Sequence, residues 1–347
     1  MHKTKSKTTV SITQKRLRLF LFVLCVVLLS GCSSVLQRAC VEQRTVFDIG
    51  SATLKMKTAK VDQCRKTAIG MIQKKEVKVA FAENTEKRLL SRAIQDKGIE
   101  HLRTLKKLAQ AEGTQRFAGT ATAAFRDADN AAEFLAEIKD QTGISIRLIS
   151  QHEEAILGYQ AAAAHVKDPS EDMVVWDIGG KSMQMIVKDR NQNYRIYRGP
   201  LASISFKNQL LEEIHHRSAG GQASPNPIGS QNLNAALGIA RNSAADVPDE
   251  IKRTICRAGA IIGIGGVHNQ SVRKQTGQIS AYRREDLMRV VQDKIELTDA
   301  QIGGPYAETD VSNLILVLGF MQKLDIEEVQ FADVNLTDGI LIDPSFW

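Results

Sequence analysis

Alternating apolar and polar residues predict that one strand–turn–strand unit occurs twice in this chain. The first copy, VFDIGSATLKMKT, lies within residues 44–61, and the second, VVWDIGGKSMQMIV, lies within residues 173–189. In each copy an apolar strand ends in Asp-Ile-Gly, small residues form a tight turn, and a second strand follows. The two aspartates, Asp48 and Asp177, are 129 positions apart (177 − 48). This spacing indicates two homologous domains, each opened by one copy.

The rest of the apolar pattern alternates between the periods of a strand and of a helix. Further strands are predicted at 76–82, 116–122, 144–149, 194–199 and 259–267. Helices are predicted at 91–109, 130–143, 152–166 and 310–324, and a loop rich in Gly, Pro and Ser at 218–230. Because strands alternate with helices, the expected class is α/β, with a first domain at 44–165 and a second at 166–347.

The N-terminus has the pattern of an export signal. Six basic residues and no acid precede the apolar run 19–29, whose eleven residues are fewer than the roughly 20 needed to cross a bilayer. The following LSGC, which ends at Cys32, resembles the lipobox of bacterial lipoproteins. We expect residues 1–31 to be a signal peptide, Cys32 to carry lipid, and 32–43 to include a tether. An ordinary signal peptide with a chance cysteine is the alternative.

Charge and location follow from this signal. The formal net charge is +7, and six of these charges lie in residues 1–31, so the remaining chain is near +1 (7 − 6). The basic isoelectric point is therefore no argument for a nucleic-acid partner, and we expect none. Ser33 rather than an acid follows Cys32, which in bacteria favours the periplasmic face of the outer membrane. The chain is 43% hydrophobic and 24% charged, a balance typical of a folded soluble protein.

Two of the cysteines are candidates for a disulfide. Counted outward from the turn at Gly50, Cys40 and Cys64 are 10 and 14 positions away, roughly opposite in an antiparallel pair. Export would place them in an oxidising compartment, where disulfides persist. We predict a Cys40–Cys64 disulfide, and two free thiols are the alternative.

The two Asp-Ile-Gly turns have the chemistry of phosphate-binding loops. Glycines let phosphate oxygens approach backbone N–H groups, and nearby hydroxyls can donate hydrogen bonds. An aspartate at a strand end can hold a divalent cation, so Asp48 and Asp177 are candidate metal ligands. Gly265-Gly266 adds a third glycine pair after a predicted strand. Structural hairpins without function are the alternative, since Asp-Gly turns are common.

Two further features lie between the turns. Arg126 follows a run of small residues and can bind a phosphate through two N–H groups, unless it pairs with Asp127 or Asp129. Glu153 and Glu154 begin a predicted helix near the domain junction. A carboxylate there can orient or deprotonate a water for attack on phosphorus, although the helix dipole alone favours acids at this position.

In this order the motifs resemble the exopolyphosphatase/guanosine pentaphosphate phosphatase (Ppx/GppA) family, over roughly residues 44–342. The matching stretches are VFDIGSAT, GTATAAFRDADNAAEFLAEIKDQTGISIRLISQHEEAILGY, VVWDIGGKS, GIGG and LDIEEVQFADVNLTDGILI. The resemblance implies two actin-like domains, of the actin/hsp70/sugar-kinase superfamily, with a cleft between them. It also implies hydrolysis of a terminal phosphoanhydride in polyphosphate or a nucleoside polyphosphate, with Mg²⁺.

The resemblance also assigns residues. Glu154 matches the family's catalytic base, and Arg126 matches its phosphate-binding arginine. The first phosphate loop corresponds to Asp48, Gly50, Ser51 and Thr53, and the second to Asp177, Gly179, Gly180 and Ser182.

The second loop departs from the family's Asp-Ile-Gly-Gly-Gly-Ser, because Lys181 replaces the third glycine. The first loop has Ala52 in place of the usual asparagine. A lysine with positive φ would be strained and could close the loop. Alternatively, its ammonium could point into the cleft and bind phosphate. The first case describes a non-catalytic envelope lipoprotein that binds a polyanion or a protein, and the second a phosphatase. A homodimer is left open.

Overall fold

The computed structural model describes residues 40–347 except 82–84, 87, 167–171 and 220–222. The expected signal peptide, Cys32 and most of the tether lie outside the described residues. No helix in the described part of the chain is long and apolar enough to cross a membrane.

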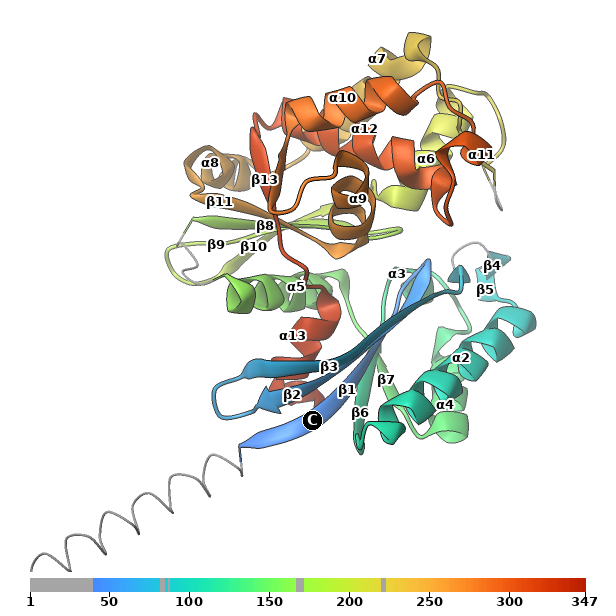
Figure 1. Cartoon of the computed structure of the whole chain (residues 1–347), viewed down its shortest axis with the longest axis vertical. Helices are drawn as coiled ribbons and strands as arrows, with labels where there is room; N and C mark the ends of the chain where they lie inside the picture. The colour runs from blue at the N-terminus through green and yellow to red at the C-terminus, as the bar shows by residue number, and fades with distance from the viewer. Residues whose placement is uncertain (1–39, 82–84, 87, 167–171, 220–222) are drawn as a thin grey trace, which may run out of the picture.

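Two β-sheets form the centres of the two halves of the molecule, and helices pack on both (Figure 1). The first sheet has the order β3-β2-β1-β6-β7. Its antiparallel part consists of β1 (Val41–Ile49), β2 (Thr53–Asp62) and β3 (Thr67–Lys78). Strands β6 (Arg116–Ala121) and β7 (Ser145–Leu148) continue it in parallel with β1. The small pair β4 (Thr85–Glu86) and β5 (Leu89–Leu90) is separate.

The second sheet has the order β10-β9-β8-β11-β13-β12. Its strands are β8 (Met173–Ile178), β9 (Met183–Lys188), β10 (Tyr194–Gly199), β11 (Ala260–Ile264), β12 (Ala281–Arg283) and β13 (Glu328–Phe331). Both sheets therefore contain an antiparallel pair around an Asp-Ile-Gly turn that is joined to parallel strands, and β12 pairs antiparallel with β13 at the edge of the second sheet. The α/β class and the repeat expected from the sequence are confirmed.

Helices cover both sheets. In the first half these are α2 (Arg92–Ala111), α3 (Ala123–Arg126) and α4 (Ala131–Thr142). In the second half they are α6 (Ser203–Glu213), α7 (Leu233–Ala245), α8 (Asp249–Arg257), α9 (Arg273–Thr276), α10 (Arg284–Lys294), α11 (Asp299–Ile302) and α12 (Ala307–Lys323), with a π-helix, η3, at Val267–Val272. The second half also contains the 3-10 turn η2 (Ser230–Asn232), and the 3-10 turn η4 (Pro344–Phe346) lies near the C-terminus.

Two helices lie between the sheets. Helix α5 (Gln151–His165) connects the halves, and its apolar residues share a core cluster with Val175 of β8. Helix α13 (Leu336–Ile342) follows the second sheet in sequence but packs on the first sheet and on α5 (Figure 1). The chain from 166 to the C-terminus therefore does not lie wholly in the second half, because its last helix returns to the first.

The alternation of side chains along each first strand positions its aspartate. In β1, Phe47 packs toward α2 and α4, whereas Val46 packs toward α13. Asp48 shares the face of Val46, since successive side chains of a strand point to opposite faces. In β8, Asp177 likewise shares the face of Val175, toward α5. Both aspartates thus point into the region between the sheets.

One predicted strand is wrong in extent. The prediction of 76–82 overlaps β3, which begins earlier and ends at Lys78. Strand β3 lies at the sheet edge, and its residues are mostly exposed or half-buried. An edge strand with two irregularities in its pairing does not need regular alternation of apolar and polar residues. The sequence pattern therefore did not predict the first half of β3.

Candidate active site

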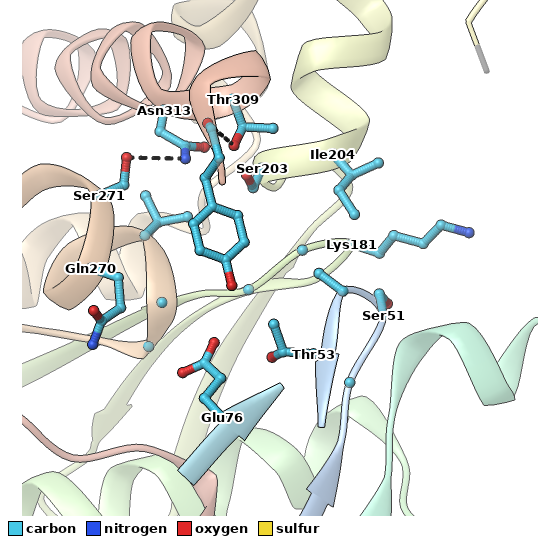
Figure 2. A pocket seen from close by; sticks show the side chains of 18 of the residues that line it. Ser51, Thr53, Glu76, Lys181, Ser203, Ile204, Gln270, Ser271, Thr309 and Asn313 are labelled. Atoms are coloured by element: carbon cyan, nitrogen blue, oxygen red, sulfur yellow. Dashed lines mark hydrogen bonds between the residues drawn. The ribbon is translucent and has the colours of Figure 1, made fainter. Parts of the chain in front are cut away.

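Both Asp-Ile-Gly turns line one cavity of about 170 Å³ between the two halves (Figure 2). All the candidate residues of both turns lie on its wall. They are Asp48, Gly50, Ser51, Thr53, Asp177, Gly179, Gly180, Lys181 and Ser182, and the wall also includes Gly265, Gly266 and Glu154. The fold therefore brings together residues that are more than 200 positions apart in the sequence, from Asp48 to Gly265 (265 − 48 = 217).

The two turns have the same local geometry and face each other. The N–H of Gly50 donates to the carbonyl of Thr53 at 2.9 Å, and the N–H of Gly179 donates to that of Ser182 at 2.9 Å. A Cβ added to Gly180 would lie 3.4 Å from the Cβ of Ser51. A small residue at position 180 lets the second turn come this close to the first.

The carboxyl groups of Asp48 and Asp177 both have raised pKa values. Both side chains are buried, and burial raises the pKa of each to about 6. The Lys55 ammonium, whose Nζ is 3.9 Å from Asp48 Oδ2, partly opposes this rise for both. Asp48 Oδ1 is buried and has no hydrogen-bond partner in the described structure. A buried oxygen without a partner is costly, so this atom is suited to a ligand that the site receives.

Lys55 is a site residue that the sequence did not reveal. Burial alone would lower the pKa of Lys55, but the surrounding carboxylates, with Asp48 first and then Glu76, hold it above its ordinary value. In TLKMKTAKV, Lys55 alternates with the apolar Leu54 and Met56, a pattern typical of a solvent-facing side of a strand. The second half of the molecule covers this face of β2, and Lys55 therefore lies in the cavity between the two halves.

Glu154 and its neighbour have separate roles. Ser150 and Glu153 form a capping box at the start of α5, in which the N–H of Ser150 donates to Glu153 Oε2 at 2.9 Å. Glu154 is buried on the cavity wall and accepts from Ser182 Oγ at 3.1 Å. Burial raises the pKa of Glu154, and Arg126 opposes the rise. The capping role thus belongs to Glu153, and Glu154 is the carboxylate available for chemistry.

Arg126 lies behind Glu154 instead of on the cavity wall. Its Nη1 donates to Glu154 Oε2 at 3.0 Å and to the carbonyl of Ile149 at 3.0 Å. Arg126 is not among the residues that line the cavity. In this arrangement it positions Glu154, whereas the sequence suggested that it binds phosphate directly. It also does not pair with Asp127 or Asp129, the alternative considered above.

Lys181 has no backbone strain, and its side chain does not fill the cavity (Figure 2). Its backbone does not have the positive φ that the closure hypothesis required, so that expectation is wrong. Its Nζ lies 3.7 Å from Asp127 Oδ2, and Figure 2 shows the side chain extending away from Glu76 and Thr53. The loop therefore accepts a lysine at this position without blocking the site.

A polar wall from the second half completes the cavity. Asn313 of α12 donates from Nδ2 to Ser271 Oγ at 3.3 Å, as Figure 2 shows, and its buried Oδ1 has no partner among the described residues. Gln270 and Tyr306 also line this side. These residues were missed because the sequence around Asn313, NLILVLGF, is that of an apolar core helix.

The cavity has two buried carboxylates of the kind that bind divalent cations. Within the described residues, the one group of three potential ligands close enough to enclose an ion is Cys40, Asp62 and Cys64, whose cysteines form a disulfide. The interior carboxylates therefore form no ready cage. Mg²⁺ is commonly bound by one or two carboxylates together with substrate phosphates and water. Asp48, with its unpartnered Oδ1, and Asp177 meet this requirement.

Comparisons with known proteins agree on one family and one fold. The model of the Ppx/GppA phosphatase family matches residues 60–345. The fold is similar to that of the Aquifex aeolicus Ppx–GppA enzyme, with a TM-score of 0.68 and 18% identity, over 87% of this chain and 99% of that one. It is also similar to an exopolyphosphatase from Cytophaga hutchinsonii, with a TM-score of 0.68 and 16% identity, over 86% and 96%. At such identities these two structures show a shared fold and nothing further.

Proposed function

This chain belongs to the Ppx/GppA phosphatase family, and from this premise we propose that it releases terminal phosphate from polyphosphate or a nucleoside polyphosphate. The observation that carries the proposal is the placement of Glu154. It is a buried carboxylate, oriented by Arg126 and Ser182, on the wall of a cavity that both Asp-Ile-Gly turns enclose.

Glu154 has the properties of a general base. Burial moves the pKa of Glu154 upward, towards neutral pH. A carboxylate with such a pKa accepts a proton from water more effectively. Arg126 and Ser182 each contact one of its oxygens, which fixes the orientation of the carboxylate. We infer that Glu154 takes a proton from the water that attacks the terminal phosphorus, and that the leaving phosphate chain departs on the opposite side.

The charges of the cavity account for a cation requirement. The residues that line the cavity carry six carboxylates and four ammonium groups, a formal excess of two negative charges (6 − 4). They are Asp48, Glu76, Glu154, Asp177, Glu308 and Asp310, and Lys55, Lys78, Lys181 and Lys274. A polyphosphate would be repelled by this excess of negative charge. A divalent cation, when bound at Asp48 and Asp177, would supply the missing positive charge and stabilise charge that develops on the phosphoryl oxygens. The backbone N–H groups of the two turns and Lys55 would orient the same oxygens.

Lys181 favours this proposal over a binding-only protein. A closed site would have Lys181 paired with Glu154 or Asp177, whereas the lysine lies beside Asp127.

We further propose, from the N-terminal sequence, that the protein is an exported lipoprotein in the cell envelope. In that location extracytoplasmic polyphosphate is the more accessible substrate.

The test is phosphate release by the soluble form, residues 33–347. Every apolar core residue of the described structure lies from Val46 to Leu341, so this form retains the whole fold. With Mg²⁺, we expect release from long-chain polyphosphate or a nucleoside polyphosphate, and none after chelation of the cation. A folded protein that binds these anions but releases no phosphate from any of them would contradict the proposal.

A further inference from the structure

The end of the β2–β3 hairpin presents exposed apolar side chains far from the cavity. We define the hairpin tip as residues 60–71. Ile69 is 54% exposed and Met71 is 56% exposed. Among large apolar residues of the described chain, Ile279 is the one other side chain that is more than half exposed. Two of three such residues therefore lie within three positions of each other on one edge strand.

The hairpin tip is also basic. Lys60, Arg65 and Lys66 are exposed, and within the described structure neither lysine makes an ion pair. The acid in this region, Asp62, is buried and accepts the backbone N–H groups of Cys64 and Arg65 at 3.0 Å each. Its other oxygen lies 3.8 Å from Arg65 Nε, so the unpaired charge of the tip is that of Lys60 and Lys66. Lys60 pairs with Gly70 and Met71 with Ala59, so charge and apolar side chains lie on opposite faces at the same end of the hairpin.

The hairpin tip is joined to the point where the N-terminal segment enters the fold. Cys40 and Cys64, the pair expected from the sequence, are linked by a disulfide with Cα atoms 5.5 Å apart. The N–H of Gln63 also donates to the carbonyl of Cys40 at 2.9 Å. Figure 1 shows the start of β1 and the hairpin at the same end of the first sheet. The hairpin tip is therefore held beside Cys40, the first described residue.

We propose that the hairpin tip is a membrane-docking surface for anionic lipid headgroups. Lys60 and Lys66 would approach the phosphate groups, and Ile69 and Met71 would enter the interface between headgroups and acyl chains. If Cys32 carries lipid, as proposed above, the seven residues 33–39 extend at most roughly 25 Å, which keeps the tip close to the bilayer. Lipidation provides one membrane signal, and a basic apolar patch is the kind of second signal that makes anchoring stable.

Docking in this way would orient the cavity. Asp48 lies near the end of β1 away from Cys40, and Val41–Ile49 at about 3.3 Å per residue spans roughly 26 Å. A molecule that rests on its hairpin tip therefore holds the cavity well above the headgroups. A polyanionic substrate would then reach the cavity away from the negative lipid surface.

A second copy of the chain is the rival occupant of this edge strand, because unpaired strand edges favour pairing. Two hairpin tips brought together would place the unpaired Lys60 and Lys66 of each copy near those of the other. This repulsion disfavours pairing of copies, whereas an anionic headgroup layer complements the same charges.

Vesicle sedimentation of residues 33–347 tests the proposal without requiring either lipidation or catalysis. We expect binding to phosphatidylglycerol-containing vesicles, little binding to phosphatidylcholine vesicles, and release by salt. The double variant Lys60→Gln, Lys66→Gln should lower the partition coefficient by about 25-fold, from about five-fold for each lysine near an anionic surface. The matched control is Lys97→Gln, Lys107→Gln on the exposed face of α2, which should bind like the parent.

The apolar part of the surface is tested in the same assay. The double variant Ile69→Ser, Met71→Ser should bind more weakly than the parent, whereas Ile279→Ser, at a more exposed apolar side chain elsewhere, should not. Equal binding to both kinds of vesicle, or equal losses in the hairpin and control variants, would overturn the proposal. So would a dimer in solution that Ile69→Ser, Met71→Ser dissociates. None of these results would depend on whether the protein releases phosphate.

Discussion

Gly265→Ala is expected to disrupt the site through a single methyl group. Gly265 has a backbone φ of +82°, which residues with a side chain rarely adopt. A Cβ there would lie 2.2 Å from Asp177 Oδ1 and 3.0 Å from the carbonyl oxygen of Ile178. The backbone conformation alone costs an L-residue about 1–2 kcal/mol. The carboxylate must also move, because a contact of 2.2 Å is not tolerated, and it then leaves its place on the cavity wall.

Gly266→Ala is the matched control one position later. Gly266 has helical angles, φ −67° and ψ −39°, and a Cβ there would meet no atom within 4 Å. Alanine fits this conformation and should stabilise the fold by about 0.4–1 kcal/mol, because it restricts the unfolded chain. The two variants should therefore differ in unfolding free energy by roughly 1.5–3 kcal/mol, from the sum of the two effects.

Urea denaturation of both variants at one pH measures this difference, and phosphate release measures the displacement of Asp177. Gly265→Ala should lose most of its activity, and Gly266→Ala should keep its fold. Equal unfolding free energies of the two variants would refute the geometric reasoning, because it predicts opposite effects on stability at neighbouring glycines.

Three further predictions concern charges in and around the cavity. The pKa of Asp177 is about 6 in the folded protein against 3.8 ordinarily, so the folded state binds the extra proton and loses stability as the pH rises through 6. Relative to Asp177→Asn, the unfolding free energy of the parent should fall by on the order of 2 kcal/mol between pH 4 and 7, and parallel urea-denaturation curves against pH would contradict this. Lys181→Ala should change stability by less than about 0.5 kcal/mol, because its pair with Asp127 is exposed, and should leave phosphate release nearly intact. A large loss of activity would show that the lysine acts in the site. Lys78→Met removes a 3.0 Å ion pair with Glu308 that joins β3 to α12, and should cost about 0.5–1 kcal/mol. Faster amide hydrogen exchange at the start of α12 is the expected sign, and unchanged exchange would show that the pair does not hold the halves together.

The repeated turns could be predicted because their chemistry is local. Each Asp-Ile-Gly turn carries its aspartate, glycines and hydroxyls within a few positions, and the strand period alone directs the aspartate to one face. The Cys40–Cys64 pairing depended on the same hairpin. In these segments the sequence and the fold agree because short-range rules determine both.

Residues whose role depends on the other half of the molecule could not be predicted in the same way. Lys55 was not predicted, because its alternation with apolar residues is that of a solvent-facing lysine and only the second half of the molecule covers it. The role of Arg126 changed because Glu154, 28 positions away, accepts its hydrogen bond. Asn313 was hidden within an apolar helix. The role of each of these residues arises from a contact between segments distant in the sequence.

The central claim is that Glu154 activates water for attack on a terminal phosphate, and its neighbour provides the sharpest control. Glu154→Gln and Glu153→Gln make the same chemical change at adjacent positions, and glutamine retains the capping function that Glu153 performs. The measurement is kcat for phosphate release from polyphosphate with Mg²⁺. We predict that Glu154→Gln lowers kcat by roughly 100-fold or more, the usual contribution of a general base, while Glu153→Gln keeps it. Equal activity of both variants would show that Glu154 is not the base.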